Sequence, residues 1–146
     1  MTKKKADHDQ LDEFSCRGMK RNNQVFKSPF LDNRDRILEN TVGFVIHDKF
    51  PVNDGHCLII PHRVYANYFD SSKEEIEGLN DLLFQAKAIL DKKYSPTGYN
   101  IGINCGADSG QTVHHLHIHL IPRYKDDMDD PSGGVRGVIP GKQKYK

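Results

Sequence analysis

Residues 113–121 read VHHLHIHLI and alternate histidine with large aliphatic side chains. In an extended strand, successive side chains point to opposite faces of the sheet. One face of such a strand would carry aliphatic residues for the core, and the other would carry three imidazoles in a row, from His115, His117 and His119. A helix would spread these histidines around its circumference, and Pro122 would still end it. The pattern therefore predicts a strand over residues 113–121.

Three other segments have the composition of short strands, namely residues 42–47 (VGFVIH), 56–60 (HCLII) and 99–104 (YNIGIN). They are rich in β-branched and aliphatic residues and are bounded by Gly, Pro, Asn or Asp, which is typical of strands that end in turns. A short connection joins the first two strands, and another joins the last strand to the histidine strand. Antiparallel pairing is therefore favoured within each pair.

An amphipathic helix is predicted between the second and third of these strands. Ser71 and Ser72 can both cap it, because a glutamate follows three residues after each. Apolar side chains then recur at helical spacing, at Ile76, Leu79, Leu82, Leu83, Ala86, Ile89 and Leu90. The order strand, strand, helix, strand, strand indicates an α+β fold in which one helix covers one face of an antiparallel sheet and the other face stays free.

Length and composition narrow the class of protein. A chain of 146 residues is long enough to bury one core, and we expect an N-terminal arm at 1–25, a folded domain at 26–125 and a tail at 126–146. The formal net charge of +1 gives no broad basic surface for nucleic acid, and no segment resembles a membrane span. Three widely spaced cysteines and the lack of a secretory signal lead us to expect a cytoplasmic protein.

The residues alone leave three interpretations of the histidine row open. The histidines can be structural, in which case each buried ring needs its own hydrogen-bond partner. They can bind a metal, because His-x-His on a strand can place two nitrogens on one zinc ion, and His56, Asp48 or Asp108 could complete the site. They can also be catalytic, because neutral imidazole keeps a lone pair that can attack phosphorus.

The loop before the histidines favours the catalytic interpretation. Residues 104–112 read NCGADSGQT, and their glycines let backbone amides approach an anion closely while Ser, Gln and Thr add neutral donors. A zinc site does not need such a loop, whereas a phosphate site does. The sequence therefore predicts a phosphate beside the histidine row.

These segments together resemble the histidine triad (HIT) family. His115-Leu-His117-Ile-His119-Leu-Ile fits the family signature His-φ-His-φ-His-φ-φ, in which φ is apolar, and residues 37–61 are similar to the family's first hairpin. The resemblance covers roughly residues 30 to 125. It implies a HIT-like antiparallel sheet of about five strands, with one main helix on one face and a purine nucleotide site on the other, and it implies a homodimer.

Members of this family cleave phosphoramidates or dinucleoside polyphosphates through a covalent nucleotidyl-histidine. By position, the resemblance implies that His117 is the nucleophile, that His119 contacts the phosphate and assists the leaving group, and that His115 and His56 orient the nucleophile. It also implies a set of nucleotide-binding residues: Asp48 at the ribose, Asn104, Gly110, Gln111 and Thr112 near the phosphate, and Phe44 and Ile46 beside the base.

Two features depart from the family pattern. Many relatives have a Cys-x-x-Cys pair near the N-terminus that binds zinc, whereas this chain has Cys16 alone, so we expect no zinc there and no cofactor. The tail extends past the signature, and its Arg136 or Lys142 is expected to reach phosphates bound by a partner subunit. The expected function is hydrolysis at the α-phosphate of a nucleotide. The alternatives are a nucleotide-binding regulatory module with little catalysis and, less favoured, a metal hydrolase.

Overall fold

The structure, a computed structural model, describes residues 20–21 and 24–145, so the predicted N-terminal arm lies almost entirely outside the described residues. Its strands are β1 (Lys20–Arg21), β2 (Gln24–Val25), β3 (Leu38–Glu39), β4 (Gly43–His47), β5 (Cys57–Pro61), β6 (Gly98–Gly102) and β7 (Ile118–Arg123). Its helices are α2 (Lys73–Tyr94) and the short 3-10 helices η1 (Pro29–Leu31), η2 (Tyr68–Asp70), η3 (Ala107–Ser109), η4 (Gly134–Val138) and η5 (Pro140–Lys142). In the described ranges, no helix combines the length and hydrophobicity needed to span a membrane.

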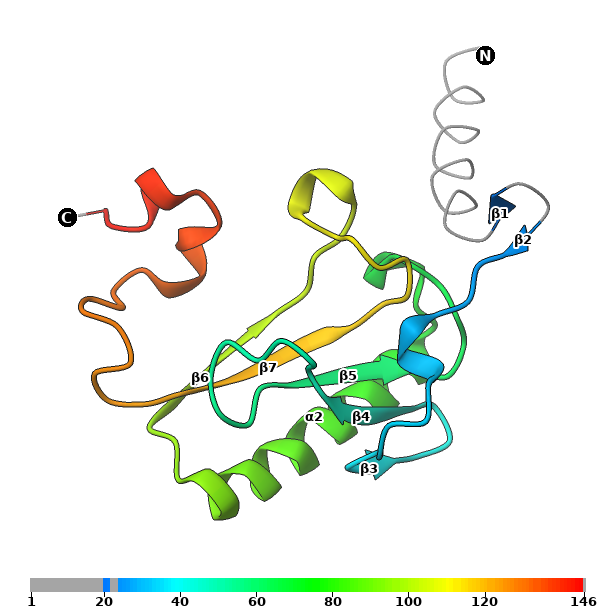
Figure 1. Cartoon of the computed structure of the whole chain (residues 1–146), viewed down its shortest axis with the longest axis horizontal. Coiled ribbons are helices and arrows are strands. Elements are labelled where there is room, and N and C mark those ends of the chain that lie inside the picture. The colour runs from blue at the N-terminus through cyan, green and yellow to red at the C-terminus, as the bar shows by residue number, and fades with distance from the viewer. Residues whose placement is uncertain (1–19, 22–23, 146) are drawn as a thin grey trace, which may run out of the picture.

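Five strands form one antiparallel sheet in the order β3-β4-β5-β7-β6, and α2 packs on one face of it (Figure 1). This confirms the predicted fold class and the pairing of β4 with β5 and of β6 with β7. Gly43 has to be glycine at the start of β4, because a Cβ there would lie 2.2 Å from the carbonyl oxygen of Ile60. That close approach aligns β4 and β5, which carry the central part of the sheet.

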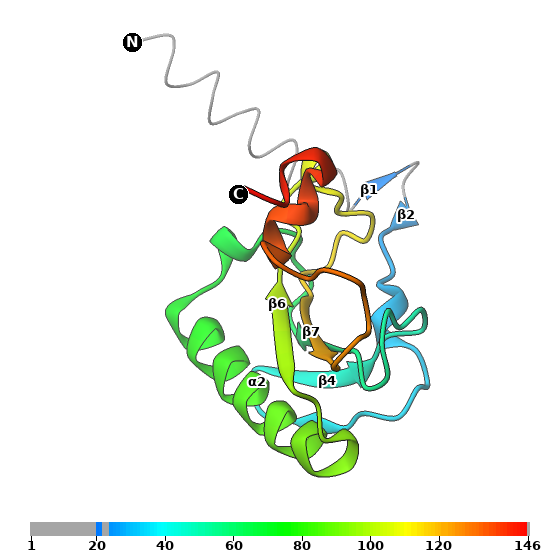
Figure 2. The same ribbon diagram turned by 90° about the vertical axis from the view of Figure 1, so that its left-hand side faces the viewer.

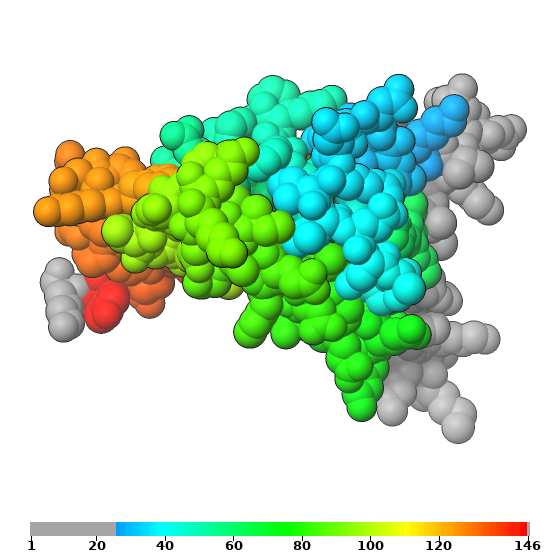
Figure 3. Space-filling view, turned by 90° about the horizontal axis from the view of Figure 1, so that it is seen from below, coloured from blue at the N-terminus to red at the C-terminus, as the bar shows by residue number. Residues whose placement is uncertain are grey.

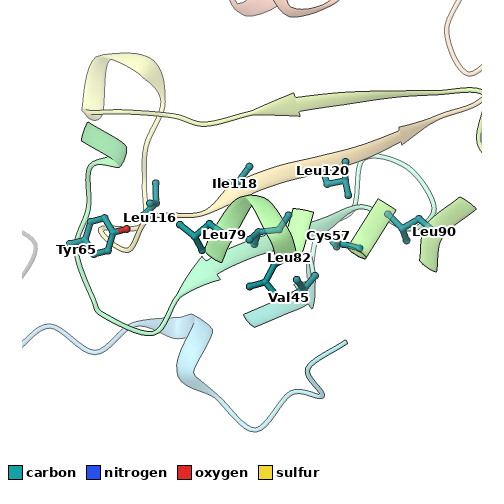
Figure 4. Packing of buried hydrophobic residues seen from close by; sticks show 11 residues of the cluster. Val45, Cys57, Tyr65, Leu79, Leu82, Leu90, Leu116, Ile118 and Leu120 are labelled. Atoms are coloured by element: carbon teal, nitrogen blue, oxygen red, sulfur yellow. The ribbon is translucent and has the colours of Figure 1, made fainter. Parts of the chain in front are cut away.

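Helix α2 begins with the predicted capping box. The Ser72 hydroxyl accepts a hydrogen bond from the amide of Glu75, and the Glu75 side chain accepts one from the amide of Ser72. The helix buries Leu79, Leu82 and Leu90, each 2% exposed or less, against the sheet (Figure 4). Burial of a leucine side chain contributes about 1.5–3 kcal/mol, so this stripe is a principal source of the core's stability. In the view from below, the green atoms of α2 lie over the face of the sheet that the helix covers (Figure 3).

The predicted strand over residues 113–121 is only half correct. Strand β7 begins at Ile118, and residues 113–117 are irregular. The pairing with β5 stops after Ile118 because Pro61 has no N–H and its carbonyl accepts a hydrogen bond from the His115 side chain. The amide of Leu116 donates to the carbonyl of Tyr65 at 2.7 Å instead of continuing the strand pairing. The expected row of three imidazoles is therefore broken at His115.

The helix-free face is also less free than expected. Phe30, in η1, packs with Phe44, Ile46, Leu58 and Ile60 as a second apolar cluster on this face. Strand alternation places these strand residues opposite the α2 side, because Val45, Cys57 and Ile59 belong to the core beneath α2. The segment before β3 thus covers part of the surface on which the nucleotide site was expected.

The tail after β7 folds back along the sheet. It leaves β7 and returns to β6 through η4, on the side opposite α2 (Figures 1 and 2). Arg136 packs over the ring of Tyr145 at 4.9 Å and donates a hydrogen bond to the carbonyl of Gln143, while Lys142 is exposed. In this chain Arg136 is therefore occupied within its own tail, and its expected contact with a partner's phosphates is untested.

Candidate active site

His117 is held by the main chain. Its Nδ1 lies 2.8 Å from the carbonyl oxygen of His115, and a carbonyl can only accept, so Nδ1 carries the proton in that contact. The neutral ring therefore has its lone pair on Nε2. The edge of the Phe30 ring packs against the imidazole, with 5.0 Å between ring centroids. His117 is half-buried and presents a fixed tautomer with one free nitrogen.

His115, whose carbonyl contacts His117, is itself fully buried. Its Nε2 donates to the carbonyl of Pro61 at 2.7 Å, so Nδ1 is the acceptor, and it takes a hydrogen bond from the Ser28 hydroxyl at 2.6 Å. Burial lowers the pKa of His115, which keeps the ring neutral. The His115 carbonyl contacts His117, and the His115 side chain anchors the segment that supplies this carbonyl, while the expected orienting role stays a prediction.

His119 and His56 form a hydrogen-bonded pair of imidazoles, with 2.9 Å between Nδ1 of His119 and Nε2 of His56. The amide of Val52 donates to Nδ1 of His56 at 3.1 Å, so a neutral His56 carries its proton on Nε2. That proton points to Nδ1 of His119, which must accept, and a neutral His119 is therefore protonated on Nε2. The His117 and His119 rings are 5.1 Å apart, so a lone pair and an N–H donor occur on adjacent rings.

The electrostatics keep this pair neutral. Burial, followed by the neighbouring His117 and His56, lowers the pKa of His119 to about 4, while Asp48 opposes the shift. Burial likewise lowers the pKa of His56. Neutral rings are needed for the alternating donor and acceptor roles, because a protonated imidazole has no acceptor.

Asp48 is shared between a turn and the histidine pair. One carboxylate oxygen accepts a hydrogen bond from the amide of Phe50, while the other lies 3.4 Å from Nε2 of His56 and 4.0 Å from Nδ1 of His119. The turn contact is a common use of aspartate at this position in a loop. The expected contact with ribose hydroxyls stays a prediction.

Within the described part of the chain, Asp48, His56 and His119 form a group that could hold a metal ion, since each offers a ligand atom within 4.8 Å of the others. The hydrogen bonds disfavour this use. Nδ1 of His56 already accepts from Val52, so metal binding through Nε2 would require an imidazolate or the loss of the Val52 contact. The residues thus fit a proton-bearing pair better than a metal centre.

The glycine loop before β7 is closed by Gln111. Its side-chain oxygen accepts from the amide of Gly106, and its side-chain nitrogen donates to the carbonyls of Ala66 and Val113. Gln111 is buried, and these hydrogen bonds brace the loop, while its expected contact with a phosphate stays a prediction. Gly110 has a φ of 97° and an exposed, open position.

Two other phosphate-site predictions stay untested. Thr112 is exposed and Asn104 is half-buried, and both lie on the segments that flank the loop. Phe44 is 0% exposed and Ile46 is 1% exposed, and their expected contacts with the base stay predictions. The guanidinium of Arg36 lies over the Phe44 ring at 4.0 Å.

The sequence did not indicate the roles of Ser28, Phe30 and the amide of Val52. Ser28 contacts a histidine 87 residues away, and Phe30 packs directly against His117. A serine before Pro29 does indicate the start of a short helix. The Ser28 hydroxyl caps that helix by accepting a hydrogen bond from the amide of Phe30. Nothing in that local pattern points to His115.

Comparison with known proteins places this site in a family. Residues 32–126 match the HIT domain. The asymmetrical bis(5'-nucleosyl)-tetraphosphatase of Schizosaccharomyces pombe is 38% identical over 80 residues, which cover 55% of this chain and 44% of that protein. The bis(5'-adenosyl)-triphosphatase of Dictyostelium discoideum is 32% identical over 107 residues, 73% of this chain and 72% of that protein.

A solved structure shares the fold. A HIT family protein from Bacillus anthracis superposes with a TM-score of 0.62 at 29% identity, over 64% of this chain and 67% of that one. The match spans less than two thirds of several curated relatives, 65%, 44% and 64% of their lengths in three cases. The matched domain contains the histidine signature, the glycine loop and the whole five-stranded sheet. The chain therefore belongs to the HIT family.

Proposed function

We propose that this protein is a nucleotide hydrolase that acts at the α-phosphate through a covalent nucleotidyl-His117. The observation that carries the proposal is the hydrogen bond from Nδ1 of His117 to the His115 carbonyl, because it leaves Nε2 as the nitrogen with a lone pair. A nucleophile needs this pre-set tautomer, and here the main chain provides it without a separate base.

In the first step, Nε2 of His117 attacks the α-phosphorus, and the bond from phosphorus to the leaving oxygen or nitrogen breaks with its electron pair on the leaving atom. His117 becomes cationic, so its Nδ1–H bond to the His115 carbonyl becomes a charge-assisted one. The Nε2–H of His119 donates a hydrogen bond to the phosphoryl oxygens or to the leaving atom, and a leaving group that needs a proton takes it from solvent. Water then attacks phosphorus and releases a proton to solvent. The phosphorus–nitrogen bond breaks with its electron pair returning to Nε2 of His117, and a nucleoside monophosphate leaves.

The substrate class is proposed from the relatives. Proteins named as a dinucleoside tetraphosphatase and a diadenosine triphosphatase match this chain, and another match is named an AP-4-A phosphorylase. We therefore propose purine dinucleoside polyphosphates as substrates, with nucleoside phosphoramidates as the second class because they present the same α-phosphate. The proposal includes a homodimer and a cytoplasmic location, for which light scattering and cell fractionation are the respective tests.

The test is hydrolysis of diadenosine triphosphate, diadenosine tetraphosphate and adenosine 5'-phosphoramidate by wild type and His117→Ala. Loss of a covalent nucleophile lowers kcat by at least about 10³-fold, while AMP binding measured by calorimetry is retained. His47→Gln is the matched control, because His47 is an exposed histidine at the end of β4. Turnover within tenfold of wild type in His117→Ala would reject the nucleophile.

The same assay separates the alternatives. Stoichiometric AMP binding without turnover of any substrate in the wild type would indicate a regulatory module. Activity that is abolished by excess chelator and restored by zinc would indicate a metal hydrolase. We expect turnover that is unchanged by chelator, because the Val52 contact keeps Nε2 of His56 protonated.

A further inference from the structure

A network of hydrogen bonds joins the loop before β5 to the chain after β7. Asp127 accepts from Nε and Nη2 of Arg123 at 2.8 and 2.7 Å and from the Tyr124 amide at 3.0 Å. It also accepts from the side-chain nitrogen of Asn53 at 2.8 Å, across 74 residues of sequence. Asp127 thus accepts hydrogen bonds from both segments, at the end of the sheet where β7 finishes.

Two further contacts hold the same loop. The Asn53 side chain also donates to the carbonyl of Pro122 at 3.1 Å, and the Tyr124 hydroxyl donates to the carbonyl of Asp54 at 2.7 Å. The Asn53 carbonyl accepts from the amide of His56 at 3.1 Å. Asn53 and Asp54 are therefore held to the chain at the end of β7 by side-chain hydrogen bonds.

The loop position matters because the amide of Val52 determines the tautomer of His56. With Val52 in place, the proton of His56 is on Nε2 and His119 accepts it, which leaves an N–H on Nε2 of His119. If Val52 moves away, Nδ1 of His56 can take the proton. Nε2 of His56 then becomes an acceptor, the shared proton belongs to Nδ1 of His119, and Nε2 of His119 changes from donor to acceptor.

We propose that Asp127 is a positioning residue, which acts through Asn53 to hold the Val52 amide on His56 and so sets the tautomers of the His56–His119 pair. Its effect on rate rests on the proposed function, because only a donor on His119 can assist the leaving group. Its effect on the tautomers does not, because these hydrogen bonds join protein groups only to one another.

The test uses two variants. Asn53→Ala removes the hydrogen bond between the loop and Asp127 and keeps the Arg123–Asp127 ion pair. Asp127→Asn weakens both that hydrogen bond and the ion pair. Asp130→Asn is the matched control, because Asp130 lies in the same tail but contacts Ser132 and Lys144 and not the loop. Imidazole ¹⁵N shifts from two-dimensional NMR report the protonated nitrogen of each histidine in the ligand-free protein. Steady-state hydrolysis of diadenosine tetraphosphate gives kcat and KM.

In wild type and Asp130→Asn we expect His56 and His119 both to be protonated on Nε2. Asn53→Ala and Asp127→Asn should shift His56 toward protonation on Nδ1 and lower kcat by about tenfold, with KM within about twofold. A wild-type His56 protonated on Nδ1, or variants with wild-type imidazole shifts, would overturn the proposal whatever their activity. If wild type hydrolyses no substrate, the shifts still decide the positioning role, while the proposed function alone fails.

Discussion

Ser28 offers a sharp test of how the site is supported, because one hydroxyl satisfies two buried groups. It donates to Nδ1 of His115 at 2.6 Å and accepts from the amide of Phe30 at 3.2 Å. Ser28→Ala removes both contacts and adds no atom, so no clash complicates the result. His115 stays neutral because burial lowers its pKa, and its Nδ1 is left without a donor.

The magnitude follows from these two losses. An unsatisfied buried acceptor costs about 1–3 kcal/mol, and the loss of a helix-capping hydroxyl costs about 0.5–2 kcal/mol. The two terms overlap, because the Phe30 amide can find water, so we expect the free energy of unfolding to fall by about 2–3 kcal/mol. For a domain of this size, that corresponds to a fall in Tm of about 5–10 °C.

Urea denaturation followed by circular dichroism measures the change. Ser109→Ala is the matched control, because the Ser109 hydroxyl is exposed and donates only to the carbonyl of Gly106. It should change stability by less than about 0.5 kcal/mol. An equally small effect for Ser28→Ala would refute the inference that the buried hydroxyl anchors His115.

Three more predictions concern stability. Leu82→Ala, on the buried face of α2 where Leu82 is 0% exposed, should cost about 3 kcal/mol in urea denaturation, and a cost below about 1 kcal/mol would contradict its place in the core. Ser72→Ala removes the capping box and should cost about 1 kcal/mol, whereas Ser132→Ala in the tail should be neutral by the same assay. The pKa of His119 is lowered to about 4 in the folded state, so the unfolded chain takes up its proton first. The contribution of neutral His119 to the free energy of unfolding is therefore complete above about pH 6.5. The free energy of unfolding falls by up to about 3 kcal/mol as pH drops from there toward 4. His119→Gln should flatten this acid-side slope, and an unchanged slope would exclude His119 as its source.

The elements predicted best are those encoded locally. Helix α2 begins at Lys73, directly after the predicted cap, because Ser72 and Glu75 form their capping box within one turn. Ile76 and Ile89, at the edges of the predicted apolar stripe, are 38% and 36% exposed, so the buried stripe is narrower than the hydrophobic pattern. The strand over 113–121 was extended too far because Pro61, 54 residues away, ends the pairing through the His115 side chain. No window of sequence contains that contact.

The same distinction applies to the site. Histidine alternation placed His117 and His119 side by side, and the structure agrees. The alternation could not show that a main-chain carbonyl and the Val52 amide would set the tautomers. The residue type of Gln111 suggested a phosphate contact but could not show that its side chain hydrogen-bonds to the main chain around the loop. Which hydrogen-bond donors and acceptors of a side chain remain available depends on its neighbours in the folded protein, and residue type alone does not specify these neighbours.

The anchoring of His117 by a peptide carbonyl has a consequence for its chemistry with any electrophile. Side-chain partners can be deleted by mutation, but the carbonyl at position 115 persists whatever residue stands there, so the ring orientation depends on the path of the backbone. Acylating or alkylating reagents that reach this imidazole meet a single reactive nitrogen. Modification of the folded protein should therefore give one regioisomer of the His117 adduct, whereas the unfolded chain gives a mixture of two.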